Sequence, residues 1–236
     1  MQHDQLPDVI AIDGPAASGK TTDGFMLARR LGYLFLDTGS MYRALTLAAL
    51  RRGLRLDDEP GLAALARTID LEVLPLREET DGRQYTVLVD GEDVTWDLRL
   101  PAVDATVSQV SAYGPVREEM VRRQRATARR GRVVMVGRDI GTVVMPDAPL
   151  KLYITASAAE RARRRLLDRR RQGHDDDYET ILADVVRRDG IDSSRQHSPL
   201  RPAAGSVILD TTDQQAEAVL AEILDLLNHA PTGEPV

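Results

Sequence analysis

The residues best suited to chemistry in this 236-residue chain lie in one short loop, which reads G-P-A-A-S-G-K-T-T. Glycine permits the backbone angles that turn successive N–H groups toward a bound anion. A helix that begins near Lys20 would add the positive end of its dipole. The loop therefore predicts binding of a nucleoside triphosphate by all of its residues, which are Gly14, Pro15, Ala16, Ala17, Ser18, Gly19, Lys20, Thr21 and Thr22.

Within this loop, Lys20 would reach the outer phosphates, while the hydroxyl of Thr21 would bind Mg²⁺. Thr22 is the less favoured choice for the metal. A chance match in an ordinary strand-to-helix turn is the alternative interpretation. The apolar run 9–12 before the loop and the helical pattern after it provide the context that a phosphate-binding loop requires.

Two further motifs follow apolar runs that are typical of strands. Asp37-Thr38-Gly39-Ser40-Met41-Tyr42-Arg43 follows the run 33–36, and Gly137-Arg138-Asp139 follows the run 133–136. Taken alone, the first is also typical of a helix cap and the second of a loop ion pair. Open α/β sheets bind ligands at the carboxyl ends of their strands, so three motifs at three strand ends favour one shared site.

Arginines are concentrated in the expected helix 158–171. Most of them are expected to form a solvated surface. Guanidinium groups that face a bound triphosphate would, however, neutralise charge during phosphoryl transfer. Residues three or four positions apart share a helix face, so Arg161 and Arg165 can point the same way. We assign catalytic roles to these two arginines, to Lys20 and to Arg138.

The composition limits the possible functions. A net charge of −6 argues against a nucleic-acid polymer as a general partner. The absence of cysteine excludes disulfides and thiol catalysis. No apolar run approaches the ~20 residues that a membrane span needs, and the polar start has no signal-peptide pattern. We expect a cytoplasmic protein without a membrane partner.

The elements that would carry these motifs alternate between strand and helix, which predicts an α/β fold with a parallel sheet. Strands are expected at 9–13, 33–36, 133–136, 151–155 and 207–209. Helices are expected at 20–31, 41–52, 62–68, 116–130, 158–171, 178–189 and 216–227, with a capping box at Ser157 and Glu160. Extended runs around turn signals predict a small antiparallel insertion at 54–110. Residues 190–204 are interpreted as a polar loop, and those after His229 as a frayed tail.

At these residues the chain resembles the bacterial cytidylate kinases, the (d)CMP kinases of the nucleoside-monophosphate kinase group. The resemblance spans roughly residues 9–227, and G-R-D-I-G-T is far more specific than the phosphate loop. It rests on five segments in the family's order, namely G-P-A-A-S-G-K-T-T, L-D-T-G-S-M-Y-R, S-Q-V-S-A-Y-G-P-V-R, G-R-D-I-G-T-V-V-M-P-D-A and R-R-D-G-I-D-S-S-R.

The resemblance implies a three-layer P-loop fold with a five-stranded parallel sheet, built from residues 1–53 and 111–236. Residues 54–110 would be the family's antiparallel monophosphate-binding insertion, and about 161–177 its short lid. It also implies ATP-dependent phosphorylation of CMP and dCMP to CDP and dCDP with Mg²⁺, by a monomer. An acceptor that is itself an ionised phosphate requires no strong base, which agrees with the absence of an evident catalytic histidine.

Matching positions assign the acceptor-binding residues. Arg43 and Arg138 would hold the acceptor phosphate. The cytosine ring would be surrounded by Thr38, Arg117, Asp139 and Arg195. The sugar would be contacted by Ser108, Arg188 and Asp192.

Two positions depart from the family pattern. Thr38 stands where many relatives have serine, and its extra methyl group is expected to crowd the ring. Val136 stands where some relatives carry an acidic residue, so a carboxylate of the magnesium shell is missing there. Two alternatives stay open: a P-loop kinase for another small acceptor, such as UMP or a sugar acid, and a nucleotide-dependent switch. A switch is less favoured because the chain lacks the N-K-x-D element of GTPases.

Overall fold

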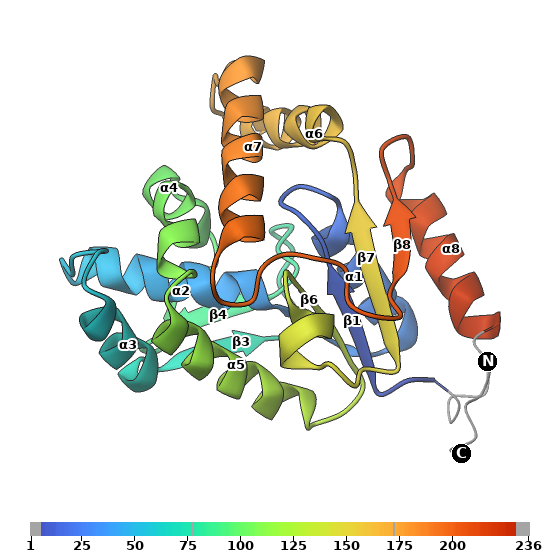
Figure 1. Ribbon diagram of the computed structural model, residues 1–236, viewed down its shortest axis with the longest axis horizontal. Coiled ribbons are helices and arrows are strands. Elements are labelled where there is room, and N and C mark those ends of the chain that lie inside the picture. The colour runs from blue at the N-terminus through green and yellow to red at the C-terminus, as the bar shows by residue number, and fades with distance from the viewer. Residues whose placement is uncertain (1–5, 77, 172, 230–236) are drawn as a thin grey trace.

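The computed structural model describes residues 6–76, 78–171 and 173–229 (Figure 1). Five strands form one sheet in the order β2-β6-β1-β7-β8, and all neighbours are parallel. Their bounds are β1 Val9–Asp13, β2 Leu34–Asp37, β6 Val133–Gly137, β7 Leu150–Thr155 and β8 Val207–Asp210. The five predicted strands and the parallel sheet are confirmed. No helix within the described ranges is long and apolar enough to cross a membrane.

Helices cover both faces of the sheet and complete three layers (Figure 1). The helices α1 (Lys20–Leu31) and α8 (Ala216–His229) pack on one face, and α2 (Thr38–Arg51) and α5 (Gly114–Ala128) on the other. Alternate residues of β1 divide accordingly, since Ile10 and Ile12 belong to one apolar cluster and Val9 and Ala11 to the other. Burial of both faces explains why this strand is an unbroken apolar run.

The segment between α2 and α5 contains a second, antiparallel sheet in the order β3-β4-β5. The strands are β3 Leu71–Leu74, β4 Thr86–Val89 and β5 Glu92–Asp93. The helices α3 (Glu59–Thr68) and α4 (Pro101–Val110) flank this sheet, with a short 3₁₀ turn at Asp97–Arg99. The predicted antiparallel sheet is therefore present, with more helix around it than expected. The boundaries 54 and 110 stay a prediction.

Two further helices, α6 (Ala158–Arg171) and α7 (Tyr178–Ser194), pack on each other through Ala162, Leu166, Ile181 and Val185. The prediction of a loop from residue 190 was wrong for its first turn, because α7 continues to Ser194. Asp192 in this turn is only 5% exposed, so tertiary burial overrides the polar pattern. Gln172 and the predicted tail after His229 lie outside the described residues.

Glycine has opposite roles in two helices, which gives a test of the packing. A Cβ on Gly24 in α1 would lie 2.5 Å from Val136 Cγ1, whereas a Cβ on Gly190 in α7 meets nothing within 4 Å. We expect Gly24→Ala to lower the free energy of unfolding by about 1–3 kcal/mol through overpacking. The matched variant Gly190→Ala should raise it by about 0.5–1 kcal/mol. Urea denaturation measures both, and shifts of the same sign would contradict this packing.

Candidate active site

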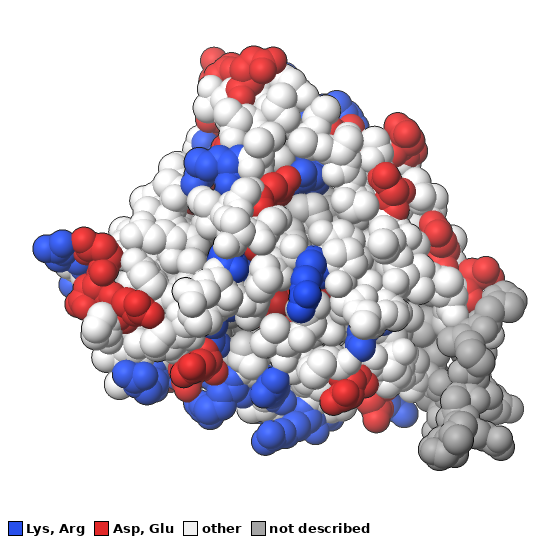
Figure 2. All heavy atoms as spheres, viewed as in Figure 1, with Lys and Arg blue, Asp and Glu red and all other residues white. Residues whose placement is uncertain are grey.

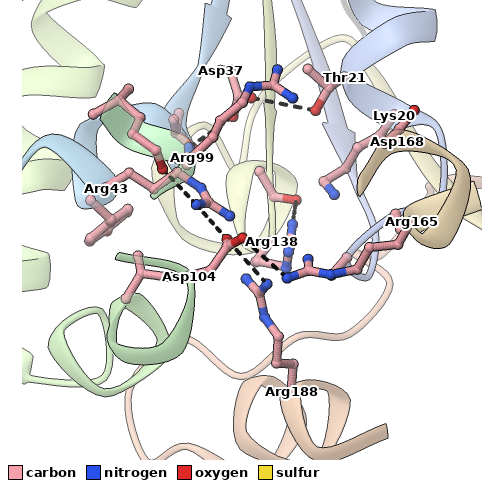
Figure 3. A pocket seen from close by; sticks show the side chains of 18 of the residues that line it. Lys20, Thr21, Asp37, Arg43, Arg99, Asp104, Arg138, Arg165, Asp168 and Arg188 are labelled. Atoms are coloured by element: carbon pink, nitrogen blue, oxygen red, sulfur yellow. Dashed lines mark hydrogen bonds and ion pairs between the residues drawn. The ribbon is translucent and has the colours of Figure 1, made fainter. Parts of the chain in front are cut away.

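A cavity of about 810 Å³ opens at the carboxyl ends of β1, β2 and β6, and Arg165 of α6 and Arg188 of α7 also line it (Figure 3). Its lining includes twelve Lys or Arg and five Asp residues, a formal balance of +7. The whole chain carries −6, and Figure 2 shows many acidic side chains along α8 and near the start of α7. Such a concentration of positive charge favours a polyanionic ligand.

The phosphate loop joins β1 to α1. A Cβ on Gly14 would lie 2.0 Å from the carbonyl oxygen of Ile154, so only glycine fits this close approach. Gly19 has φ 96°, and the buried hydroxyl of Ser18 has no hydrogen-bond partner. Lys20 donates from Nζ to Pro15 O at 2.8 Å. Burial, followed by nearby Arg138, lowers the pKa of Lys20 well below its ordinary value. The loop has the glycine geometry and the single lysine that a phosphate group requires.

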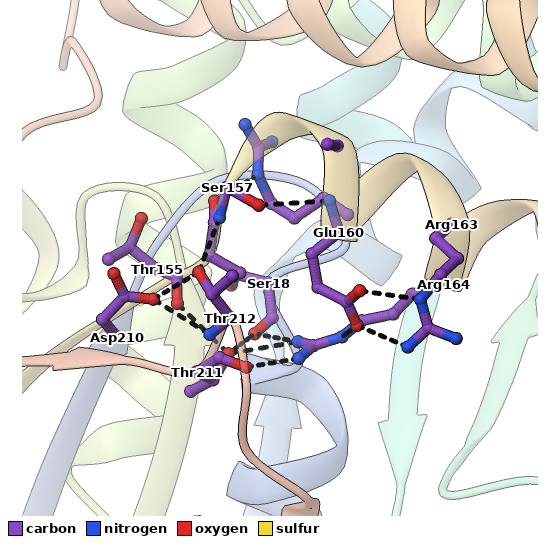
Figure 4. Close-up of polar contacts among 12 residues, drawn as sticks. Ser18, Thr155, Ser157, Glu160, Arg163, Arg164, Asp210, Thr211 and Thr212 are labelled. Carbon is purple, nitrogen blue, oxygen red and sulfur yellow. Dashed lines mark hydrogen bonds and ion pairs between the residues drawn. The ribbon is translucent and has the colours of Figure 1, made fainter.

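The structure places Arg161 outside the cavity and Arg164 in its wall, whereas the sequence analysis singled out Arg161 and not Arg164. Arg161 does not line the cavity: it donates to Ala16 O at 3.1 Å and forms an ion pair with Asp189 at 2.5 Å. It therefore braces the phosphate loop from behind, and its direct catalytic role stays a prediction. Arg164, which was not predicted, lines the cavity and donates to Ser18 O and to the hydroxyl of Thr211 (Figure 4).

The capping box at the start of α6 is half formed (Figure 4). Ser157 Oγ accepts from the backbone N–H of Glu160 at 3.2 Å, as predicted. The Glu160 carboxylate does not return to the N–H of Ser157, which donates to Thr212 Oγ1 instead. The Glu160 carboxylate forms ion pairs with Arg163 and Arg164, at 2.7 and 2.8 Å. The carboxylate thus orients an arginine of the cavity wall.

Three arginines gather around Asp104, a residue of α4 that the sequence did not single out (Figure 3). Their shortest distances to its carboxylate are 2.7 Å for Arg43, 3.3 Å for Arg165 and 3.9 Å for Arg188. Burial, together with Arg43, Arg165 and Arg138, lowers the pKa of Arg188 to about 10. Nε and Nη1 of Arg188 have no hydrogen-bond partner. Arg165 also pairs with Asp184 at 3.4 Å, so two carboxylates face three arginines and the cluster keeps excess positive charge, which suits a phosphate group.

The opposite end of the cavity is built around Asp139. Its Oδ2 lies 2.5 Å from Arg117 Nη2, and its Oδ1 lies 3.9 Å from Arg195 Nη2. The guanidinium of Arg117 also stacks on the Tyr42 ring at 5.3 Å. Arg117 Nε and Arg195 Nη2 are buried without a hydrogen-bond partner. These donors, which lack hydrogen bonds, lie beside a carboxylate and form a polar surface that suits a nucleobase.

The remaining predicted residues are distributed around the same cavity. Arg138 Nε pairs with Asp192 at 2.9 Å, and Thr38 Oγ1 donates to Val136 O at 2.9 Å. The predicted residues that line the cavity are Ala16, Ala17, Gly19, Lys20, Thr21, Thr22, Thr38, Arg43, Ser108, Arg117, Arg138, Asp139, Arg165, Arg188, Asp192 and Arg195. Gly14, Pro15, Ser18 and Arg161 do not line it. The individual roles stay predictions.

Asp13 is another residue that the sequence analysis missed. Both of its carboxylate oxygens accept backbone N–H groups, from Ile140 at 2.7 Å and from Gly141 at 2.8 Å. Burial raises its pKa to about 6 despite these bonds. Asp13 thereby ties the end of β1 to the turn that follows Arg138 and Asp139. A lone Asp at the end of a buried strand was the available signal.

Asp23, in the first turn of α1, gives a test of burial in this region. Burial raises its pKa to about 7, although Arg164 opposes the shift. The folded state therefore binds a proton between about pH 4 and 7 that the unfolded state releases. The contribution of Asp23 to stability falls as pH rises through this window, by about 1.4 kcal/mol per pH unit. We expect Asp23→Asn to remove this slope in urea denaturation at pH 5, 6 and 7; an unchanged slope would disprove it.

Comparison with known proteins agrees with this arrangement. The family model for cytidylate kinase matches residues 10–229. A cytidylate kinase of Roseiflexus castenholzii is 52% identical over 221 residues, which cover 93% of this chain and 94% of that protein. Another, of Chloroflexus aggregans, is 53% identical over 87% of each chain. Among solved structures, a shikimate kinase of Acinetobacter baumannii is 17% identical, over 96% of this chain and 95% of that one, with a TM-score of 0.45. This similarity is too distant to bear on the acceptor. The chain belongs to the cytidylate kinase family.

Proposed function

We propose that this protein transfers the γ-phosphoryl group of ATP to CMP or dCMP and releases ADP with CDP or dCDP. An oxygen of the acceptor phosphate attacks the γ-phosphorus, and the bond from that phosphorus to the β–γ bridging oxygen breaks. The acceptor is mostly ionised at neutral pH, since its second pKa is near ~6. The protein therefore needs to position two phosphates and stabilise charge, and a strong base is not required.

The unpaired groups around Asp139 are the observation that carries this proposal. Arg117 Nε and Arg195 Nη2 are buried donors without a hydrogen-bond partner, and Asp139 Oδ1 is an acceptor beside them. Cytosine offers two acceptors, the oxygen at position two and the ring nitrogen at position three, followed by an amino donor at position four. Uracil also offers two acceptors and one donor, but in a different order, with the donor at position three and acceptors at positions two and four. A carboxylate at position four and an arginine donor at position three therefore complement cytosine and not uracil.

The arginine cluster supports the transfer step. Arg43, Arg165 and Arg188 surround Asp104, and Arg138 lies between this cluster and Lys20 in Figure 3. We assign Arg43 and Arg138 to the acceptor phosphate, and Lys20 to the outer phosphates of ATP. Arg165 would reach the transferred group from α6. In this arrangement, positive charge surrounds the line of transfer.

The donor atoms of the cavity also fit magnesium. Thr21 presents its hydroxyl oxygen to the cavity beside Lys20, and hard oxygen ligands are the ones that Mg²⁺ prefers. Phosphate oxygens of ATP would complete most of the shell. When bound, Mg²⁺ neutralises charge on the β- and γ-phosphates. Within the described ranges, no group of three or more His, Cys, Asp or Glu forms a separate metal site.

A kinase for UMP or for a sugar acid is the second candidate within this fold. The groups around Asp139 disfavour it, because uracil would leave buried donors and acceptors unmatched. A nucleotide-dependent switch would leave the arginine cluster at Asp104 without a purpose. A cytoplasmic location, a monomeric state and the absence of a nucleic-acid partner belong to the same proposal. The monomeric state rests on the family resemblance, and the other two rest on the composition and charge of the chain.

The first test concerns base choice. The asparagine side chain of Asp139→Asn offers a donor as well as an acceptor. The variant should therefore narrow the difference in kcat/KM between CMP and UMP, chiefly through lost CMP activity. In the unaltered protein, two mismatches at about 1–3 kcal/mol each should lower kcat/KM for UMP by at least about one to two orders of magnitude. Arg138→Met should lower kcat/KM for both substrates together, because a phosphate contact is common to them. ADP release measures each ratio, and an unchanged ratio in Asp139→Asn would show that Asp139 does not read the base.

The second test concerns Lys20. Lys20→Met keeps the apolar stem and removes the charge, so turnover should fall by about 10²–10³-fold while the fold is retained. Lys151, in β7, is the only other lysine of the chain and does not line the cavity. Lys151→Met is therefore the matched control and should turn over normally. Circular dichroism checks the fold, and near-normal turnover of Lys20→Met would refute the role of Lys20.

A further inference from the structure

The two carboxylate oxygens of Asp37 have different surroundings. Oδ1 accepts from the backbone N–H of Gly39 at 2.9 Å and so caps α2. Oδ2 lies on the other side, 3.4 Å from the hydroxyl of Thr21 and 3.3 Å from the phenol of Tyr85. Figure 3 shows Asp37 directed toward Thr21, above the arginine cluster. Oδ1 thus stabilises the start of α2, while Oδ2 faces the start of α1.

Asp37 also differs from the other acidic residues of the cavity. Four of the five Asp residues in the lining form ion pairs with arginine, namely Asp104, Asp139, Asp168 and Asp192. Across the described ranges, Asp37 forms no ion pair with Lys or Arg, although twelve such residues line the same cavity. The carboxylate accepts hydrogen bonds from Thr21, Gly39 and Tyr85, and the charge of Lys20 acts on it from beyond ion-pair distance. A partly buried carboxylate without a direct ion pair still costs free energy. Its position beside a hydroxyl in an otherwise cationic cavity points to a cation as the missing partner.

The sheet explains why this carboxylate comes from β2. Asp37 is the register partner of Val136 on the adjacent β6, so both side chains lie on the α1 face. Val136 is fully buried against Gly24, and its hydrocarbon side chain has no atom that could bind an ion. Asp13, at the end of β1, uses both oxygens to accept the N–H groups of Ile140 and Gly141. Among these three strand ends, only Asp37 has an oxygen directed at Thr21.

We propose that Asp37 Oδ2 holds Mg²⁺ together with Thr21 Oγ1, either directly or through one bound water. Mg²⁺ in nucleotide sites is held by one or two carboxylates, substrate phosphates and waters, and this pair of oxygens provides the protein's share. Tyr85 donates its phenolic hydrogen to the same oxygen and orients it. The inference rests on the proposed use of Mg²⁺ with ATP.

Asp37→Asn separates the two tasks of this residue. Asparagine caps helices as well as aspartate does, so Oδ1 can still accept from Gly39. At the Oδ2 position, the amide nitrogen donates hydrogen bonds and cannot bind a cation. Asp58 is the matched control, because it caps α3 by accepting from Gly61 at 3.1 Å and does not line the cavity. Asp58→Asn makes the same chemical change at an exposed cap.

The measurement is Mn²⁺ binding to the complex of the protein with ADP, by electron paramagnetic resonance, alongside calorimetry of ADP in EDTA. We expect Asp37→Asn to weaken Mn²⁺ binding about tenfold or more, the usual effect of losing a shell carboxylate. ADP affinity without metal should be unchanged or higher, because a negative charge near the phosphates is removed. Asp58→Asn should match the unaltered protein in both measurements.

Two outcomes would overturn the inference. In the first, Mn²⁺ affinity of Asp37→Asn equals that of the unaltered protein. In the second, ADP affinity in EDTA falls as much as metal affinity, which would indicate a structural role alone. CMP is absent from these experiments, so they do not depend on the acceptor. Failure of the unaltered protein to bind ADP would instead refute the proposed function.

Discussion

Excess positive charge in one cavity is the constraint on which the rest of the structure depends. Buried guanidinium groups repel one another and lose hydration, so each needs a counter-charge or a ligand. Asp104 holds three of them, while Asp139 and Asp192 hold Arg117 and Arg138. The carboxylates leave several nitrogens unpaired. The cavity is therefore organised to accept anions, and its arginines are already held in place before a nucleotide arrives.

The sheet brings the parts of this cavity together. β6 lies between β1 and β2, so the phosphate loop and the Asp37 motif stand on either side of Arg138. Asp13 bonds the end of β1 to the turn after Asp139, which couples the phosphate-loop side of the cavity to the Asp139 side. These backbone bonds are charge-assisted and buried, so they hold the turn rigidly. A site that transfers a group between two phosphates requires such fixed geometry.

The helix α6 is attached to the phosphate loop at more than one point. Arg161 donates to Ala16 O, and Arg164 donates to Ser18 O. Arg165, one position further, faces Asp104 on the opposite wall. Arginines on one helix thus have distinct tasks, bracing the loop, lining the cavity and spanning it. The difference follows from helix geometry, because neighbouring positions are rotated by about 100°.

The sequence by itself determined the parts that depend on local pattern. The apolar run of β1 specifies a strand buried on both faces, and the glycines of the phosphate loop specify a backbone that lets N–H groups converge. All nine residues that the resemblance assigns to the acceptor line one cavity, although their individual roles stay predictions. The antiparallel strands were also found, since turn residues and alternation are local signals.

The tertiary structure alone decided the partners of each charge. The contacts of Asp104, of Asp13 and of the outer oxygen of Asp37 cannot be inferred from local pattern, because they come from segments distant in sequence. The extension of α7 to Ser194 likewise depends on burying Asp192 in the cavity. Arg161 and Arg164 appear equivalent in the sequence, and the packing of α6 is what places Arg164, and not Arg161, in the cavity wall. Local patterns specify backbone shape, whereas charge pairing depends on distances that exist only after the chain has folded.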